Sequence, residues 1–197
     1  MARAPRPEDV GFTLVETLFA LAIIATLAAV ALPTANDAVD EMRTLMAARS
    51  LAARLSQIRI DAVTRSRCLA LRFEAAGGVY RWSVYADGNG NGVRTADIAA
   101  GVDVSLGPKE MLGDKFPGVA LGLLPGYPDA DNVAGTGSDG VRIGTARILT
   151  MSPDGTATAG TLYLHGRRNQ FAIRVLGATG RIRVLQYDQG RGTWITR

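Results

Sequence analysis

Residues 12–32 read FTLVETLFALAIIATLAAVAL, and the only charged side chain in this run of 21 residues is Glu16. An α-helix rises 1.5 Å per residue, so the run would be about 30 Å long, which matches the hydrocarbon core of a bilayer. Loops and single strands leave backbone polar groups unsatisfied in lipid, whereas a helix satisfies its own. The run therefore predicts a membrane-spanning helix, and this helix decides the fold.

A cleaved secretory signal is the competing interpretation of the same run. Such a signal has a shorter apolar region, roughly 7–15 residues, that ends in a small-residue cleavage site, for which Ala29-Val30-Ala31 would serve. The observed run is longer and carries Glu16 near its start. A carboxylate inside a membrane is costly and usually has a partner and a purpose. We therefore expect a retained helix in which Glu16 has a role.

The stretch Gly11-Phe12-Thr13-Leu14-Val15-Glu16 resembles the processing site of type IV pilins and type II secretion pseudopilins. The resemblance implies that a prepilin peptidase cuts after Gly11 and that the new N-terminal residue, Phe12, is methylated. It also implies that the apolar helix becomes the packing core of a filament of pilin-like subunits. Pro33 stands where these proteins commonly have a helix-kinking proline.

The chemistry of these residues agrees with the implied roles. A glycine at position 11 lets a protease approach the backbone closely. After cleavage Phe12 would carry a free ammonium, and Glu16 lies one helical turn further on. In a medium of low dielectric constant, pairing that ammonium with Glu16 of the same or an adjacent subunit is favoured over leaving either charge alone.

The segment after Pro33 continues as an amphipathic helix. Apolar residues recur every three to five positions and alternate with arginines, so that one face is suited to a core. We expect this helix to span residues 33–66. From Cys68 onward the pattern changes to short alternating runs separated by turn residues such as Ala76-Gly77-Gly78 and Ala178-Thr179-Gly180, which is typical of antiparallel strands. The strands are predicted at 68–74, 79–86, 102–106, 119–123, 147–151, 156–164, 170–176, 181–187 and 193–195.

These patterns predict an α+β fold in which a long N-terminal helix packs on an antiparallel, sandwich-like β domain. The expected organisation is a leader at 1–11, a transmembrane helix at 12–32, an amphipathic helix at 33–66 and a β-rich domain at 67–197. Residues 107–140 are rich in glycine, proline and aspartate, which predicts a long irregular excursion.

Two C-terminal stretches extend the family resemblance. The segments 151–164 (MSPDGTATAGTLYL) and 179–184 (TGRIRV) resemble the GspH and FimT branch of minor pseudopilins. The branch implies a pilin-like fold, a single-pass protein of the inner membrane and a β-rich domain in the periplasm.

The composition excludes several classes of site. A single cysteine, Cys68, rules out an intramolecular disulfide framework, and a single histidine, His165, argues against histidine-rich metal centres. Charge is unevenly spread along the chain. Residues 86–140 carry 3 basic and 8 acidic side chains, a net charge of −5, whereas residues 141–197 carry 9 and 2, a net charge of +7.

A calcium loop is one hypothesis for residues 87–98. Asp87, Asn89 and Asn91 stand at the first, third and fifth positions of an EF-hand-like pattern, with a glycine at the sixth. The twelfth position is Ile98 rather than glutamate, and Asp97 comes one residue early. Because Asp, Asn and Gly also form ordinary turns, the alternative is a structural turn with no cofactor.

A DNA-binding face is the hypothesis for Gly180-Arg181-Ile182-Arg183. On a strand Arg181 and Arg183 point to the same side, and guanidinium groups bind phosphates in a bidentate manner. In the FimT branch a motif of this kind is associated with DNA capture. The alternative is a solvated strand face.

Two functions follow from the sequence, and neither is enzymatic. The first is a minor pseudopilin of a type II secretion system, a structural subunit that assembles with other pseudopilins. The second is a FimT-like minor type IV pilin that contributes to pilus assembly and DNA binding.

Overall fold

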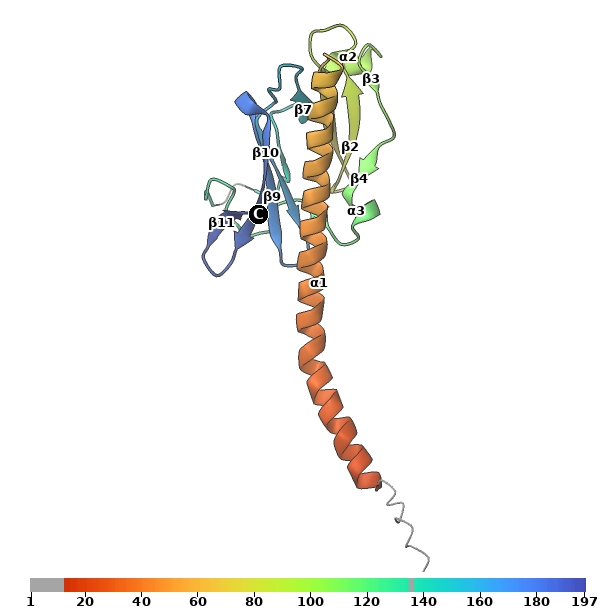
Figure 1. Cartoon of the computed structure of the whole chain (residues 1–197), viewed down its shortest axis with the longest axis vertical. Coiled ribbons are helices and arrows are strands. Elements are labelled where there is room, and N and C mark those ends of the chain that lie inside the picture. The colour runs from red at the N-terminus through yellow and green to blue at the C-terminus, as the bar shows by residue number, and fades with distance from the viewer. Residues whose placement is uncertain (1–12, 135–136) are drawn as a thin grey trace, which may run out of the picture. The chain divides into compact units, whose positions relative to one another are not determined.

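The structure, a computed structural model, describes residues 13–134 and 137–197 (Figure 1). The chain divides into two compact units, residues 1–39 and residues 40–197. Its first element is α1 (Leu14–Thr64), a single helix of 51 residues that continues through Pro33 and ends two residues before the predicted limit. The helix is therefore continuous across the predicted boundary between residues 32 and 33. That the residues before this boundary span a membrane stays a prediction.

In the second unit, the inner face of α1 forms one wall of the core. The residues on this face are buried at helical spacing, as the amphipathic pattern predicts: Ala47, Ala48, Leu51, Leu55, Ile58 and Ala62. The helix ends where the chain turns at Ser66, a residue with a positive φ of 50°.

The first sheet contains β1 (Leu69–Ala76), β2 (Val79–Ala86), β3 (Val104–Ser105), β4 (Glu110–Met111) and β7 (Ile148–Met151). Among the described residues the order is β3-β2-β1-β7, with β4 also paired to β2, and all pairs are antiparallel. Strands β1 and β2 are joined by the two-residue turn Gly77-Gly78, in which both glycines have positive φ, as a tight hairpin requires.

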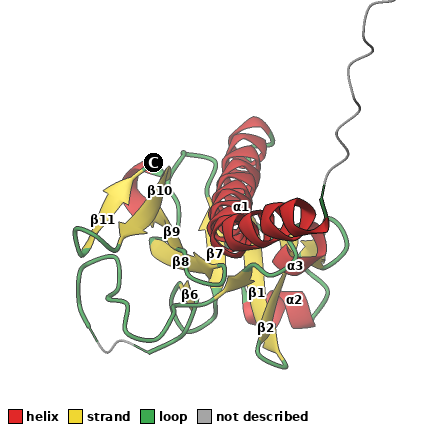
Figure 2. Ribbon diagram, turned by 90° about the horizontal axis from the view of Figure 1, so that it is seen from below, coloured by secondary structure: helices red, strands yellow, loops and turns green. Residues whose placement is uncertain are grey.

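The second sheet contains β5 (Ala120–Leu121), β6 (Val141–Arg142), β8 (Gly160–His165), β9 (Gln170–Leu176), β10 (Arg181–Asp188) and β11 (Thr193–Thr196). Its order over the described residues is β11-β10-β9-β8-β5, with β6 also paired to β8. In Figure 2, strands β8 to β11 of this sheet lie at the left of the view, and β1 and β2 of the first sheet lie at the lower centre. The predicted combination of a long N-terminal helix with antiparallel sheets is confirmed.

The short elements were not predicted. They include helix α2 (Thr95–Ala99) with five residues, helix α3 (Leu112–Lys115) with four and the 3-10 turn η1 (Gly177–Thr179) with three. Strands β4 and β6 have two residues each. Most predicted strands match observed ones within a few residues, but 156–164 shortens to Gly160–His165. Ala157 instead makes an isolated bridge to Met151.

One main core joins α1 to both sheets. Side chains from the first sheet, such as Leu71 and Phe73, and from the second, such as Leu164 and Phe171, are at most 3% exposed in the same cluster as the inner face of α1. Burial on this scale contributes about 25 cal/mol per Å² of apolar surface, so the helix and the sheets hold one another in place.

Candidate functional site

The first part of α1 exposes its apolar side chains on all sides. In the part of the chain that the structure describes, α1 is the one helix long and apolar enough to cross a membrane. An 18-residue stretch of it has a mean hydropathy of 2.3, and none of the residues of that stretch is buried. The exposed side chains include Leu14 (77% exposed), Phe19 (67%), Leu27 (66%) and Leu32 (63%). An apolar surface this large is covered by lipid or by other proteins in a stable assembly.

Glu16 caps the start of this helix. Its Oε2 accepts hydrogen bonds from the Thr13 N–H at 3.0 Å and the Thr13 hydroxyl at 2.9 Å, while the Glu16 N–H donates to Thr13 Oγ1 at 3.3 Å. This reciprocal arrangement is a capping box, which a Thr-x-x-Glu sequence before an apolar run indicates. This capping box is an addition to the roles predicted for Glu16. Gly11 and Phe12, the predicted cleavage and methylation residues, lie outside the described residues.

Pro33 lies within α1 and leaves the helix unbroken. Because proline has no N–H, the helix lacks one i→i−4 hydrogen bond at this point. The next residue, Thr34, donates its hydroxyl to the Ala31 carbonyl at 2.9 Å. The assembly role predicted for Pro33 stays a prediction.

Asp40 anchors α1 to the hairpin between β8 and β9. Its two oxygens each lie 3.0 Å from the Arg167 N–H, and Oδ2 also accepts from Asn169 Nδ2 at 3.1 Å. Asp40 is only 8% exposed. Gly166 permits this approach, because a Cβ there would lie 2.7 Å from the Asp40 oxygens and 2.4 Å from Thr44 Oγ1. No sequence signal linked these distant residues.

The outer face of α1 in the second unit carries an exposed stripe. We call it the α1 stripe and define it by residues spaced alternately four and three apart, all of them exposed: Met42, Met46, Arg49, Ala53, Ser56, Ile60 and Val63. Met46 and Ile60 are 56% and 58% exposed. A spacing that alternates between three and four residues is the one with which helices pack side by side. The stripe is therefore a surface on which another helix can pack.

Arg181 and Arg183 lie on one exposed face of β10, as predicted. Neither guanidinium has a hydrogen-bond or carboxylate partner among the described residues. Arg174 stands directly opposite Arg183 in the register of β9 and β10. Gly180, with a φ of +56°, closes the turn before this face, and a Cβ there would lie 2.4 Å from the Gly155 carbonyl oxygen. The glycine of this motif thus has a structural role.

The other tail arginines do not join this face. Arg191 Nε lies 3.6 Å from an oxygen of Asp188, near the start of β11. Arg197 Nε donates to Gln186 Oε1. Arg167 and Arg168 belong to the β8–β9 hairpin, at the opposite end of β9 from the turn that precedes Arg181. The basic face of β10 therefore consists of the exposed Arg181 and Arg183, with the partly buried Arg174 beside them on β9. Arg174 pairs with Asp131.

The loop that begins at Asp87 is closed by its own backbone. Asp87 Oδ1 accepts from the Asn89 and Gly90 N–H groups at 3.1 and 2.7 Å, and Oδ2 accepts from the Gly92 N–H at 2.7 Å. Burial works to raise the pKa of Asp87, but these N–H groups outweigh it and hold the pKa below its ordinary value. The side chain thus serves the turn in its ionised form.

The side chains of the other predicted calcium ligands make contacts of their own in the described residues. Asn89 Oδ1 accepts from the Asn91 N–H at 3.2 Å. Asp97 lies in α2, and its Oδ2 is buried without a partner in the described residues. A second carboxylate, Asp103, also holds this loop. It is 1% exposed and accepts hydrogen bonds from the Gly88 and Arg94 N–H groups, both at 2.9 Å. The described residues contain no group of three or more Asp, Glu, His or Cys side chains able to hold a metal.

Four chains of solved structures are similar to this chain, and they include two structures of one minor pseudopilin. No family model and no curated protein sequence matches the chain. A structure of the minor pseudopilin EpsH from the type 2 secretion system of Vibrio cholerae is 15% identical over 73% of this chain and 97% of that chain, with a TM-score of 0.46. A crystal structure of the minor pseudopilin EpsH of the same organism is 12% identical over 79% of this chain and 94% of that chain, with a TM-score of 0.40.

Proposed function

We propose that this chain is a structural subunit of a pilin-like filament, a minor pseudopilin of a type II secretion system. The observation that carries the proposal is α1, an unbroken helix of 51 residues. Its first part is apolar, exposed and preceded by Gly11-Phe12, and its second part belongs to a β-rich body. One element would thus supply both a membrane anchor and one wall of the folded core.

The membrane part would hold the subunit as a single-pass protein of the inner membrane, with residues 40–197 in the periplasm. On assembly the exposed apolar side chains would exchange lipid for the equivalent helices of other pseudopilins. In this role the chain performs no chemistry of its own, and movement of the filament is driven by other components.

Glu16 would have two successive roles. In the precursor it closes the capping box with Thr13. After cleavage behind Gly11, the ammonium of Phe12 would be a stronger partner, because a charged pair gains more than a neutral hydrogen bond where water is excluded. Subunits would then be held in register by this pair, and a subunit without the carboxylate would enter the membrane but not the filament.

Processing tests the proposal directly. Intact mass of the protein purified from a host with a prepilin peptidase should correspond to a chain that begins at Phe12 and carries one extra methyl group. Gly11→Val should leave the precursor at full length, because the side chain obstructs approach to the scissile bond, whereas Val10→Ala should be processed normally. A mature chain that begins at Met1, or beyond Ala31, would refute the assignment.

A second function, DNA contact by a FimT-like minor pilin, is favoured by one specific observation. Arg181 and Arg183 are exposed on the same face and have no carboxylate partner among the described residues. Arginines of this kind hold phosphates without reading the base sequence. DNA binding would then be lost as salt rises, with a slope in log–log form of about −0.9 for each phosphate contacted.

A gel-shift titration with duplex DNA tests this second function. Arg181→Ala with Arg183→Ala should weaken binding at low salt and make the salt dependence shallower. Arg191→Ala, which removes an arginine near Asp188, is the matched control and should change little. Equal binding by all three proteins would exclude this face as the DNA contact and leave the secretion role.

Calcium binding by the loop at Asp87 stays a prediction of the sequence. A calcium ion would have to replace the three N–H groups that the carboxylate already accepts. Calorimetry with millimolar calcium tests it, and we expect no heat of binding.

A further inference from the structure

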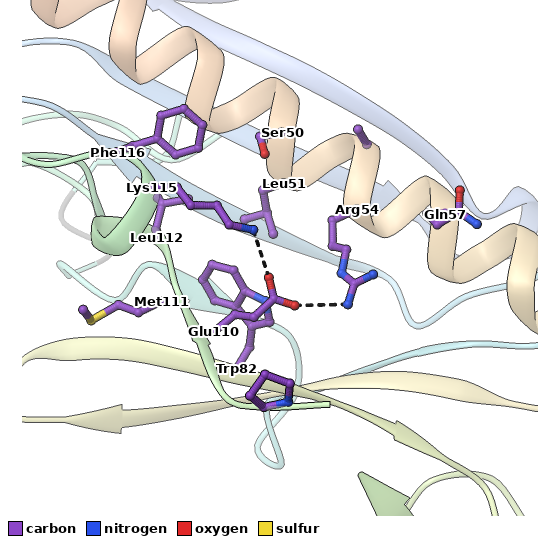
Figure 3. A pocket seen from close by; sticks show the side chains of 12 residues that line it. Ser50, Leu51, Arg54, Gln57, Trp82, Glu110, Met111, Leu112, Lys115 and Phe116 are labelled. Carbon is purple, nitrogen blue, oxygen red and sulfur yellow. Dashed lines mark hydrogen bonds and ion pairs between the residues drawn. The ribbon is translucent and has the colours of Figure 1, made fainter. Parts of the chain in front are cut away.

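A groove runs alongside α1 in the second unit, away from the arginine face and the Asp87 loop. Its volume is about 730 Å³, and it lies between α1 and the segment 108–116 that contains β4 and α3 (Figure 3). The groove is lined by apolar side chains of both sides, among them Leu51, Trp82, Leu112 and Phe116. Of these, Leu51, Trp82 and Leu112 also belong to the main core and are at most 5% exposed. The floor of the groove is therefore fixed by the fold.

The indole N–H of Trp82, at the floor of the groove, has no hydrogen-bond acceptor among the described residues. The side chain is 5% exposed. Buried donors in folded proteins nearly always have a partner, and an unpaired one costs about 1–3 kcal/mol. Nε1 is itself inaccessible from the groove surface, so what Trp82 presents to an occupant is its ring.

The charges at the rim of the groove are unequal. Arg54 Nη2 lies 3.1 Å and Lys115 Nζ 3.5 Å from the two oxygens of Glu110, so two cations share one carboxylate. Their side chains are 43% and 69% exposed, which leaves donors available on both. Figure 3 shows all three side chains around the groove. The rim thus complements an anionic group.

The α1 side of the groove is built for close approach. Ser50 and Ala53 line it and are exposed, and small side chains on a helix allow another polypeptide to lie near the backbone. Amphipathic segments bind to proteins by placing their apolar face in a groove of this kind, which has an apolar floor and a wall of small residues.

We propose that this groove binds an acidic, amphipathic segment of a partner protein. An apolar side chain of that segment would rest on Trp82 and Leu51, and an adjacent carboxylate would meet Arg54 and Lys115. The inference does not depend on the filament role, because every residue that carries it lies in the unit of residues 40–197.

Selection from a displayed library of random 12-residue peptides tests the groove without a known partner. The bait is the full chain in detergent, and the selection is run in parallel on the Ala53→Trp chain, in which an exposed position is filled by a large ring. We expect enriched peptides to place Asp or Glu next to a large apolar residue on the natural chain, and the enrichment to disappear on Ala53→Trp.

The affinity of the best peptide then tests the charge argument. Trp82 emission in a Trp194→Phe background reports binding near the floor. Arg54→Glu should weaken binding about tenfold, because a favourable rim charge becomes a repulsive one. Arg49→Glu makes the same charge change on α1 outside the groove lining and should leave the affinity within about twofold.

The other outcomes overturn the proposal. No enrichment, or enrichment that Ala53→Trp does not affect, would mean that the groove is not a peptide site. Apolar peptides without an acidic residue would remove the role of Arg54 and Lys115. Displacement of the peptide by laurate at comparable concentration would assign the groove to small amphiphiles instead of a protein segment.

Discussion

Asp40 is the residue on which the attachment of α1 depends most. Its buried carboxylate accepts from main-chain and amide N–H groups of the β8–β9 hairpin, at 3.0–3.1 Å for Arg167 and Asn169. Removing it leaves these donors unsatisfied in a site closed by Gly166. We expect Asp40→Ala to lower the free energy of unfolding by about 2–4 kcal/mol, measured by urea denaturation.

Two further variants make this prediction specific. Asp40→Asn keeps the shape but presents an NH₂ group to donors, so an intermediate loss is expected. Asp114→Asn changes an exposed carboxylate and should stay within about 0.5 kcal/mol of the natural chain. Equal stability of Asp40→Ala and Asp114→Asn would show that the hairpin contact contributes nothing.

Tyr80 gives the fold a dependence on alkaline pH. Burial, together with a hydrogen bond from its hydroxyl to Asp139, raises the pKa of Tyr80 to about 12. A phenol whose pKa rises on folding holds its proton more tightly in the native state. Its contribution to stability is therefore complete below the unfolded pKa of about 10 and is lost as the pH rises toward 12.

Unfolding midpoints measured between pH 9 and pH 12 should show this loss. The decline should be smaller in Tyr80→Phe, which has no proton to release, and unchanged in Tyr85→Phe. A decline of the same size in all three proteins would place its origin elsewhere.

At the scale of elements, α1 in the second unit has two faces with different tasks. Leu55 is fully buried in the core, whereas Met46 of the α1 stripe is 56% exposed. Leu55→Ala should cost about 2–5 kcal/mol of stability, because it leaves a cavity. Met46→Ser with Ile60→Ser should cost under about 1 kcal/mol in urea denaturation, because both side chains are already in solvent.

The stripe variant should instead impair assembly. If neighbouring helices pack on the stripe, Met46→Ser with Ile60→Ser will reduce the fraction of chain recovered in sheared filaments. Val79→Ser makes the same kind of change on the β1–β2 hairpin, where the valine is 43% exposed. Full incorporation of the stripe variant would mean that this face stays in solvent.

The long elements could be predicted from the sequence because their signals are local. Strands β2 and β9 begin and end at the predicted residues, since alternation and flanking glycines mark them. Strand β4 has no such signal, because its two residues form a strand only through pairing with Arg81 and Trp82. The Asp40 anchor and the groove depend in the same way on residues far apart in the chain. The Thr13–Glu16 box was predictable from its spacing and was overlooked.

At the scale of the whole molecule, part of the uneven charge is matched within one chain. Ion pairs between the acidic segment 86–140 and the basic tail include Asp129–Arg142 at 3.3 Å, Asp131–Arg174 at 2.6 Å and Asp139–Arg147 at 2.9 Å. Sequence alone left open whether these charges meet within one molecule or across two. The strand register places Arg142 and Arg174 on either side of Thr161 of β8, where each meets an aspartate of the same chain.

The strength of these pairs should follow their burial. Asp129 and Arg142 have side chains that are 13% and 23% exposed, and Arg142 also lies over the Tyr163 ring, 5.0 Å from its centroid. A double-mutant cycle to alanine should give a coupling of about 1 kcal/mol for this pair. Asp131, 66% exposed, should couple to Arg174 by less than half as much, and only weakly in high salt.

Since the pairs close within one molecule, the unfolding midpoint at fixed detergent should not change with protein concentration. A midpoint that rises with concentration would mean that the acidic segment pairs with the tail of a second copy.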